Sequence, residues 1–244
     1  MDAASDAPPA RQSAPMSDQD RIARLRDNMV DSQVRPNRVT DPRLLAGMRR
    51  LPRERFLPAT MRHLAYLDTE IRLPRGRALL EPMVVARLIQ LLSPAAGERA
   101  LVIGAGSGYA AALLAACGAA VTALEDDADL VALARAVLPE VAPAVRLVTG
   151  PLATGWPADA PYDVILIDGA VSAIPPLLAS QLTPGTGRLA TIVAHPDGAL
   201  PPGLPVVGSA VLAEATQAGL RPQPVFDCTA SLIPALLPAP AFSF

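Results

Sequence analysis

The residues with the clearest chemical potential form a glycine loop, Gly104-Ala105-Gly106-Ser107-Gly108. An apolar run precedes the loop and a run of small residues follows it, which predicts a strand, a tight turn and a helix. Glycines permit such a turn and lack the Cβ atoms that would keep a ligand away from the backbone. Glu125 ends the next apolar run, 17 residues after Gly108. A carboxylate at that place can accept hydrogen bonds from both ribose hydroxyls of an adenosine.

Two classes of cofactor fit this arrangement. Nicotinamide dinucleotides favour Gly-x-Gly-x-x-Gly with a small third residue, and Tyr109 would take that position here and obstruct the packing of helix on strand. S-adenosylmethionine has no pyrophosphate, and its sites use Gly-x-Gly-x-Gly. The spacing therefore favours S-adenosylmethionine, with its amino-acid end over the loop. A dinucleotide site and a glycine turn without a ligand are the alternatives.

The elements that position the loop alternate between strand and helix. The pattern predicts strands at 99–103, 120–124, 145–148, 162–167 and 188–194, and helices at 83–92, 110–116, 130–138 and 174–182. This order predicts an α/β fold, a doubly wound and mostly parallel sheet of Rossmann-like type with right-handed crossovers and helices on both faces. The proline-rich segment 200–244 should add short antiparallel edge strands.

Three segments follow from this pattern. Residues 1–16, rich in proline and small polar residues, should be a disordered tail. Residues 17–82 should form a helical extension on the substrate side, with helix starts at Ser17 and at Thr40-Asp41-Pro42. Residues 83–244 should form the domain that binds the cofactor.

Composition narrows the classes of partner. The net charge of −2 leaves no basic surplus for nucleic acid, and no stretch of about 18 uncharged apolar residues is available to span a membrane. Two cysteines and two histidines are too few and too scattered for a disulfide framework or a metal site. Arginines crowd 35–55 and 72–77, which we interpret as a solvated surface rather than a patch for an acidic substrate. We expect a cytoplasmic protein, either a monomer or a homodimer.

Several motifs resemble the protein-L-isoaspartate (D-aspartate) O-methyltransferase family. They are Met48-Arg-Arg-Leu-Pro-Arg-Glu-Arg-Phe-Leu-Pro58, Ala65-Tyr66-Leu-Asp68, Ile103-Gly-Ala-Gly-Ser-Gly-Tyr109 and Tyr162-Asp-Val-Ile-Leu-Ile167 with Ile174-Pro175 and Gln181-Leu182. The resemblance covers roughly residues 24–195 in order. It implies a class I methyltransferase that uses S-adenosylmethionine to methylate the carboxylate of isoaspartyl residues in damaged proteins, a repair reaction with protein or peptide substrates.

The resemblance weakens at the substrate side. The family carries a segment close to Gly-Gln-Thr-Ile-Ser-(Gln/Ala)-Pro, which aligns here with Gly76 to Pro82. Arg77 then stands at the glutamine, Ala78 replaces the threonine and Leu80 replaces the serine taken as the active-site hydroxyl. We therefore assign no catalytic residue. The alternatives are a divergent member that binds S-adenosylmethionine but acts on another acceptor, and a non-catalytic protein that binds the cofactor.

Other positions are candidates for cofactor contacts. Gly150-Pro151-Leu152 replaces the family's Gly-Asp-Gly, so the carboxylate that contacts adenine is missing and the backbone N–H of Leu152 is expected to take its place. Asp126 follows Glu125, and Asp168 follows the fourth predicted strand at the edge where ligands gather. His195, after the fifth predicted strand, could line the site, although a histidine in a turn is the simpler interpretation. Arg75 and Arg77 could bind a carboxylate bidentately, although surface exposure is the simpler interpretation.

Overall fold

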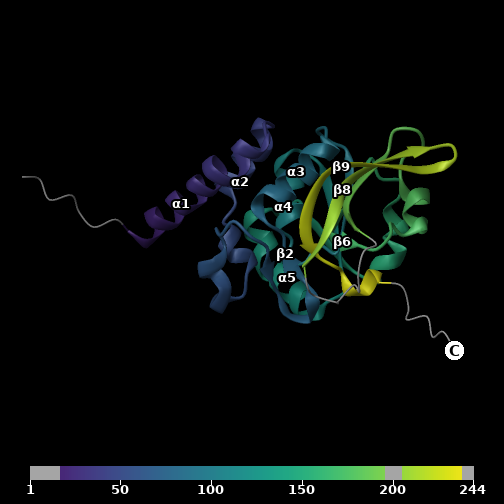
Figure 1. The fold of residues 1–244 in the computed structure, drawn as a ribbon. Coiled ribbons are helices and arrows are strands. Elements are labelled where there is room, and N and C mark those ends of the chain that lie inside the picture. The colour runs from purple at the N-terminus through teal and green to yellow at the C-terminus, as the bar shows by residue number, and fades with distance from the viewer. Residues whose placement is uncertain (1–16, 196–204, 238–244) are drawn as a thin grey trace, which may run out of the picture.

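A seven-stranded sheet organises the part of the chain that the structure describes, residues 17–195 and 205–237 (Figure 1). In this computed structural model the strand order is β5-β4-β3-β6-β7-β8-β9. The strands are β3 (Arg99–Ile103), β4 (Ala120–Glu125), β5 (Arg146–Thr149), β6 (Val164–Val171), β7 (Arg188–Ala194), β8 (Pro205–Thr216) and β9 (Gly219–Ser231). The first five are parallel and the last two antiparallel, so the predicted α/β class is confirmed. The predicted tail, residues 1–16, lies outside the described residues.

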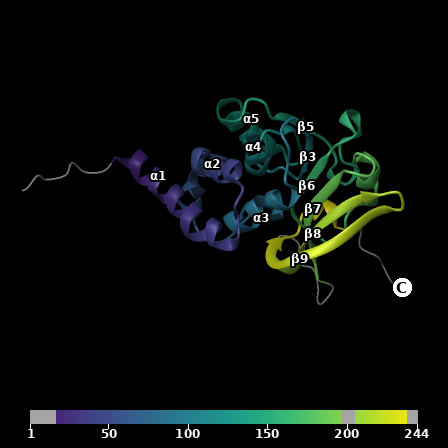
Figure 2. The same ribbon diagram turned by 90° about the horizontal axis from the view of Figure 1, so that it is seen from above.

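Three α-helices cover one face of the sheet (Figure 2). They are α3 (Pro82–Leu92), α4 (Tyr109–Ala116) and α5 (Ala128–Val141). Side chains alternate along each strand, so Ala100 and Val102 of β3 join the core with these helices, whereas Leu101 and Ile103 join a second core on the opposite face. Burial of both faces explains why the strand sequences are almost continuously apolar.

The opposite face carries short 3-10 turns, one of them in the segment where a helix is predicted. They are η6 (Leu152–Thr154), η7 (Pro157–Asp159), η8 (Pro176–Gln181) and η9 (Pro234–Leu236). The predicted helix at 174–182 is therefore wrong. Pro175 and Pro176 have no backbone N–H to donate, and the Gln181 side chain donates to the Thr154 carbonyl and accepts from the Trp156 N–H instead of extending a helix.

The C-terminal strands are longer than predicted. β8 and β9 form one antiparallel hairpin, visible as the long ribbon pair in Figures 1 and 2. β9 is the outermost strand, which is why it tolerates Pro222 and Pro224. The edge position was predicted, but the length was not.

The N-terminal extension packs into the same core as α3 and α4. It contains α1 (Asp18–Met29), a π-helical turn η1 (Val30–Val34), η2 (Arg35–Asn37), α2 (Pro42–Arg50), η3 (Arg53–Phe56) and η4 (Ala59–Leu64), followed by β1 (Ile71–Arg72), η5 (Pro74–Gly76) and β2 (Ala78–Leu79). Both predicted helix starts are confirmed. The Ser17 hydroxyl accepts from the Asp20 N–H at 3.1 Å, and Asp41 accepts from the Arg43 N–H at 2.9 Å.

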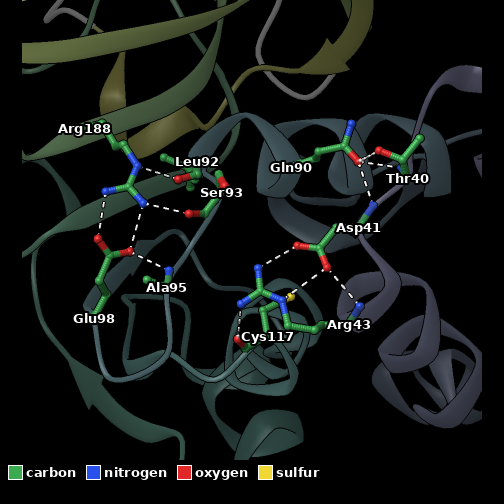
Figure 3. A network of polar contacts seen from close by, with 10 residues as sticks. All are labelled: Thr40, Asp41, Arg43, Gln90, Leu92, Ser93, Ala95, Glu98, Cys117 and Arg188. Atoms are coloured by element: carbon green, nitrogen blue, oxygen red, sulfur yellow. Dashed lines mark hydrogen bonds and ion pairs between the residues drawn. The ribbon is translucent and has the colours of Figure 1, made fainter.

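Polar side chains tie this extension to α3 and α4, and tie α3 to the sheet (Figure 3). The amide oxygen of Gln90 accepts from the backbone N–H groups of Thr40 and Asp41, and Arg43 donates to the Cys117 carbonyl at 3.1 Å. In the same figure, Arg188 pairs with Glu98 and donates to the carbonyls that end α3. These contacts fix the position of α3 against β7 and the position of residues 40–43 against α3. Across 17–195 and 205–237, no helix combines the length and apolar character that crossing a bilayer requires.

Candidate cofactor site

The glycine loop lies between the carboxyl end of β3 and the start of α4, as predicted. Gly104, Gly106 and Gly108 have φ values of 67°, 59° and 96°, a region that side chains with a Cβ rarely adopt. The Ala105 N–H donates to the Leu124 carbonyl at 3.0 Å, which fastens the loop to the end of β4. The loop therefore turns tightly next to Glu125.

Glu125 is fully buried at the end of β4 and is surrounded by donors. Its Oε2 accepts from the Gly106 N–H at 2.6 Å, and its Oε1 accepts from the N–H groups of Asp126 and Asp127 at 2.9 and 3.0 Å. These three bonds compensate the carboxylate for its loss of water. The sequence thus placed Glu125 beside the glycine loop correctly, and the loop itself helps to hold it.

Arg77 is the residue that the sequence interpretation placed wrongly. Its side chain is only 6% exposed, whereas a surface position was expected. Nη1 and Nη2 donate to the two oxygens of Glu125 at 2.8 and 2.9 Å, and Nη2 also donates to the Gly104 carbonyl at 2.7 Å. Arg75, two residues earlier, is exposed as expected and pairs with Asp127 and Asp129 on the surface.

These residues do not fit an adenosine as they stand. A ribose would have to donate to the Glu125 carboxylate, and Arg77 occupies that side of it. The remaining cavity measures about 260 Å³ and is lined by Arg75, Arg77, Asp126, Asp127, Pro234 and Ala235. Sites for small ligands usually measure about 300–1,000 Å³. The cavity is thus smaller than such sites, and Arg77 forms part of its wall.

The other predicted contact residues differ in their positions relative to this cavity, and among them only Asp126 is one of its lining residues. Asp126 lines it, and burial and the neighbouring Glu125 raise the pKa of Asp126. Leu152 begins η6 and is buried. Ser107 is buried, and its hydroxyl has no partner within 17–195 and 205–237. Asp168 lies where the pairing of β6 with β7 shifts register, and its Oδ1 is likewise buried without a described partner.

Burial raises the pKa of Asp168 to about 7, although the charges of Arg77 and Arg53 oppose the shift. The folded protein therefore keeps a proton that the unfolded chain releases near pH 4, and the free energy of unfolding should fall as the pH rises from 4 through 7. Asp168→Asn should abolish this pH dependence. Between pH 5 and pH 8.5, the free energy of unfolding of the variant should therefore rise relative to that of the native protein by on the order of 1–3 kcal/mol. Urea unfolding at both pH values measures it; an equal pH dependence in the two proteins would contradict the assignment.

Arg53 is a second buried arginine that the sequence interpretation left on the surface. It is completely buried, donates to the carbonyls of Ala65 and Leu80 at 2.8 and 2.6 Å, and lies 4.7 Å above the centre of the Tyr109 ring. Burial lowers its pKa. The only signal for it was its place in the motif Leu51-Pro52-Arg53, next to apolar residues. Arg53 links Leu80, just before α3, to Tyr109 at the start of α4, the helix that follows the glycine loop.

The remaining candidates do not join the loop. The Tyr66 hydroxyl donates to Glu54 and accepts a hydrogen bond from Arg26. His195 follows β7 and contacts Ser209 at 2.9 Å, beside a separate apolar cavity. Among the residues that are described, no group of three or more His, Cys, Asp or Glu side chains could hold a metal ion.

Comparison with known proteins agrees with the motifs. The family model described as Protein-L-isoaspartate(D-aspartate) O-methyltransferase (PCMT) matches residues 24–198. The protein-L-isoaspartate O-methyltransferase of Methylorubrum populi is 42% identical over 173 residues, which cover 71% of this chain and 81% of that protein. That of Koribacter versatilis is 38% identical over 173 residues, 70% of this chain and 78% of the relative.

Solved structures support the fold. One protein-L-isoaspartate O-methyltransferase superposes with a TM-score of 0.67 at 22% identity, over 85% of this chain and 64% of the other, so this chain spans just under two thirds of its length. A Plasmodium falciparum protein assigned to the same activity, in complex with S-adenosyl-L-homocysteine, gives a TM-score of 0.65 at 19% identity over 83% and 95% of the two chains.

The family match covers well over half of the chain, and the two curated relatives cover more than two thirds of it. The predicted family and its fold are therefore confirmed, and so is S-adenosylmethionine as the cofactor that this family uses. The chain belongs to the protein-L-isoaspartate(D-aspartate) O-methyltransferase family.

Proposed function

We propose that this protein transfers a methyl group from S-adenosylmethionine to the free carboxylate of isoaspartyl residues in proteins or peptides. The observation that carries the proposal is the identity of about two residues in five with enzymes of that name, over most of the chain. The bound cofactor would supply a sulfonium methyl group. A carboxylate is already ionised at pH 7, so the protein's main task is to position it.

The glycine loop and Glu125 support the cofactor side of the proposal, whereas the acceptor side is altered. Ala78 and Leu80 stand where the family carries hydroxyls, and Leu80 is buried with its carbonyl bonded to Arg53. Glu81 follows, and burial together with the carboxylates of Asp68 and Glu70 raises its pKa. These features favour, as the second candidate, a methyltransferase of the same family with another acceptor.

Methyl transfer to an isoaspartyl peptide, compared with the same peptide containing a normal aspartate, tests the proposal. Labelling of the isoaspartyl peptide alone is expected. If neither peptide is labelled, although the protein binds S-adenosylhomocysteine, the result would favour the second candidate.

Restoring both hydroxyls should raise the activity. The double change Ala78→Thr, Leu80→Ser is expected to increase kcat/KM for the isoaspartyl peptide on the order of tenfold, because one hydrogen bond to an ionised group contributes about 1.5–3 kcal/mol. Leu79→Ser is the matched control, since Leu79 is also buried but stands at the family's isoleucine. A rise in the control equal to that in the double variant would refute the assignment of the hydroxyls.

A further inference from the structure

The Glu125 carboxylate has no free position for a ribose. Its two oxygens accept five hydrogen bonds, from Nη1 and Nη2 of Arg77 and from the backbone N–H groups of Gly106, Asp126 and Asp127. A carboxylate offers about four lone-pair positions. The three backbone donors belong to the loop and the strand end, so Arg77 is the only one of these partners that can leave without unfolding the site.

Arg77 also lies against the bare backbone of the loop. A Cβ built on Gly104 would come within 2.9 Å of Arg77 Nη2 and 3.0 Å of Ile233 Cδ1. The space that glycine keeps open at this position is therefore filled by two side chains of the same protein, one that precedes the glycine loop in the sequence and one that follows it.

The apolar side of the site is covered in the same way. Ile233 and Leu236 belong to one buried cluster with Leu152, whose N–H was expected to bind adenine. This cover is anchored, because the Ile233 N–H donates to the Ala170 carbonyl at 2.9 Å and Glu70 accepts from the N–H and hydroxyl of Ser231. The protein's own residues thus stand on both the polar and the apolar side of the site.

We propose that Arg77 is a built-in competitor of the cofactor, and that S-adenosylmethionine binds only after the guanidinium has left Glu125. The inference rests on the proposed function. Asp126 provides a place for the displaced charge, since its Oδ1 already lies 3.6 Å from Arg77 Nη1 and its side chain is 34% exposed. Arg77 can therefore leave the ribose position and keep an acidic partner.

Such competition lowers the apparent affinity in proportion to the fraction of molecules in which Arg77 has moved. A variant without the guanidinium should therefore not show this reduction in apparent affinity. The variant Arg77→Gln carries the glutamine that the family has at this position. Its Glu125 carboxylate keeps the three backbone donors.

Isothermal calorimetry with S-adenosylhomocysteine tests the proposal on the full chain. Arg77→Gln should bind at least tenfold more tightly than the native protein. Arg221→Gln is the matched control, because it removes the same charge from an exposed position on β9, outside the residues that line the cavity, and it should stay within twofold of the native affinity. If Arg77→Gln does not fold, as judged by circular dichroism, Arg77→Lys should also tighten binding, since a lysine cannot form the bidentate pair.

The outcomes separate the two proposals. Native and Arg77-substituted proteins that fold and bind S-adenosylhomocysteine equally well would overturn the competitor and leave the proposed function standing. A tenfold gain in Arg221→Gln as well would also overturn it, because the effect would then come from general charge. Absence of binding in all three proteins would overturn the proposed function and this inference with it.

Discussion

Replacement of Glu125 by alanine should destabilise the protein by about 3–5 kcal/mol, the usual effect of removing one partner from a buried ion pair. The substitution leaves the guanidinium of Arg77 buried without its carboxylate and also orphans the N–H groups of Gly106, Asp126 and Asp127. Urea unfolding at neutral pH measures the change.

Glu98→Ala is the control for this prediction. Glu98 also pairs with an arginine through both carboxylate oxygens, but the Arg188 and Glu98 side chains are 20% and 24% exposed, so water can replace part of the lost interaction. We expect a loss of only about 1 kcal/mol. A loss in Glu125→Ala no larger than that in Glu98→Ala would mean that the buried pair with Arg77 does not contribute as described.

Replacement of Arg53 by alanine should cost a similar amount, about 3–5 kcal/mol. The guanidinium fills a completely buried site and satisfies the carbonyls of Ala65 and Leu80, and alanine would leave a cavity and two buried acceptors without donors. Thermal and urea unfolding report the loss.

Tyr109→Phe provides the contrast to Arg53→Ala. The Tyr109 ring packs beneath Arg53 and against Phe56, but its hydroxyl is buried without a partner in the described parts of the chain. Phenylalanine keeps the ring and removes only that hydroxyl, so the stability should change by less than about 1 kcal/mol. An Arg53→Ala protein as stable as Tyr109→Phe would show that the two carbonyls find other donors.

The parts of the fold that local sequence determines were predicted well. The strand at Arg99–Ile103 and the glycine loop after it depend on an apolar run and on glycines that adopt positive φ, both of which are visible in the sequence. Glu125 was found for the same reason, since it follows the next strand directly. The N-terminal helix caps at Ser17 and Asp41 are also local interactions.

The errors concern residues whose position depends on distant partners. Arg77 reaches a carboxylate 48 positions away, and Arg53 donates to Leu80, 27 positions away, so neither environment can be derived from neighbouring residues. Exposure is the usual state of an arginine, and buried arginines are exceptions that only tertiary contacts reveal. The available signal for Arg77 was its place in the substituted segment, where a long charged side chain stands at the family's glutamine.

The turn at Pro176–Gln181 shows a different limit. Its apolar residues repeat in a way that resembles a helix, yet Leu178 is buried while Leu177 is exposed, and the segment closes with 3-10 geometry. The two successive prolines at its start, which lack a backbone N–H, oppose an α-helix there although the apolar spacing suggests one.

The crystal structure of the native protein with S-adenosylhomocysteine would test the displacement of Arg77 most directly. The account predicts that the ribose hydroxyls donate to Glu125 and that the Arg77 guanidinium has moved away from both Glu125 oxygens, toward Asp126. A bound S-adenosylhomocysteine next to an Arg77–Glu125 pair that keeps both of its hydrogen bonds, now 2.8 and 2.9 Å, would contradict it.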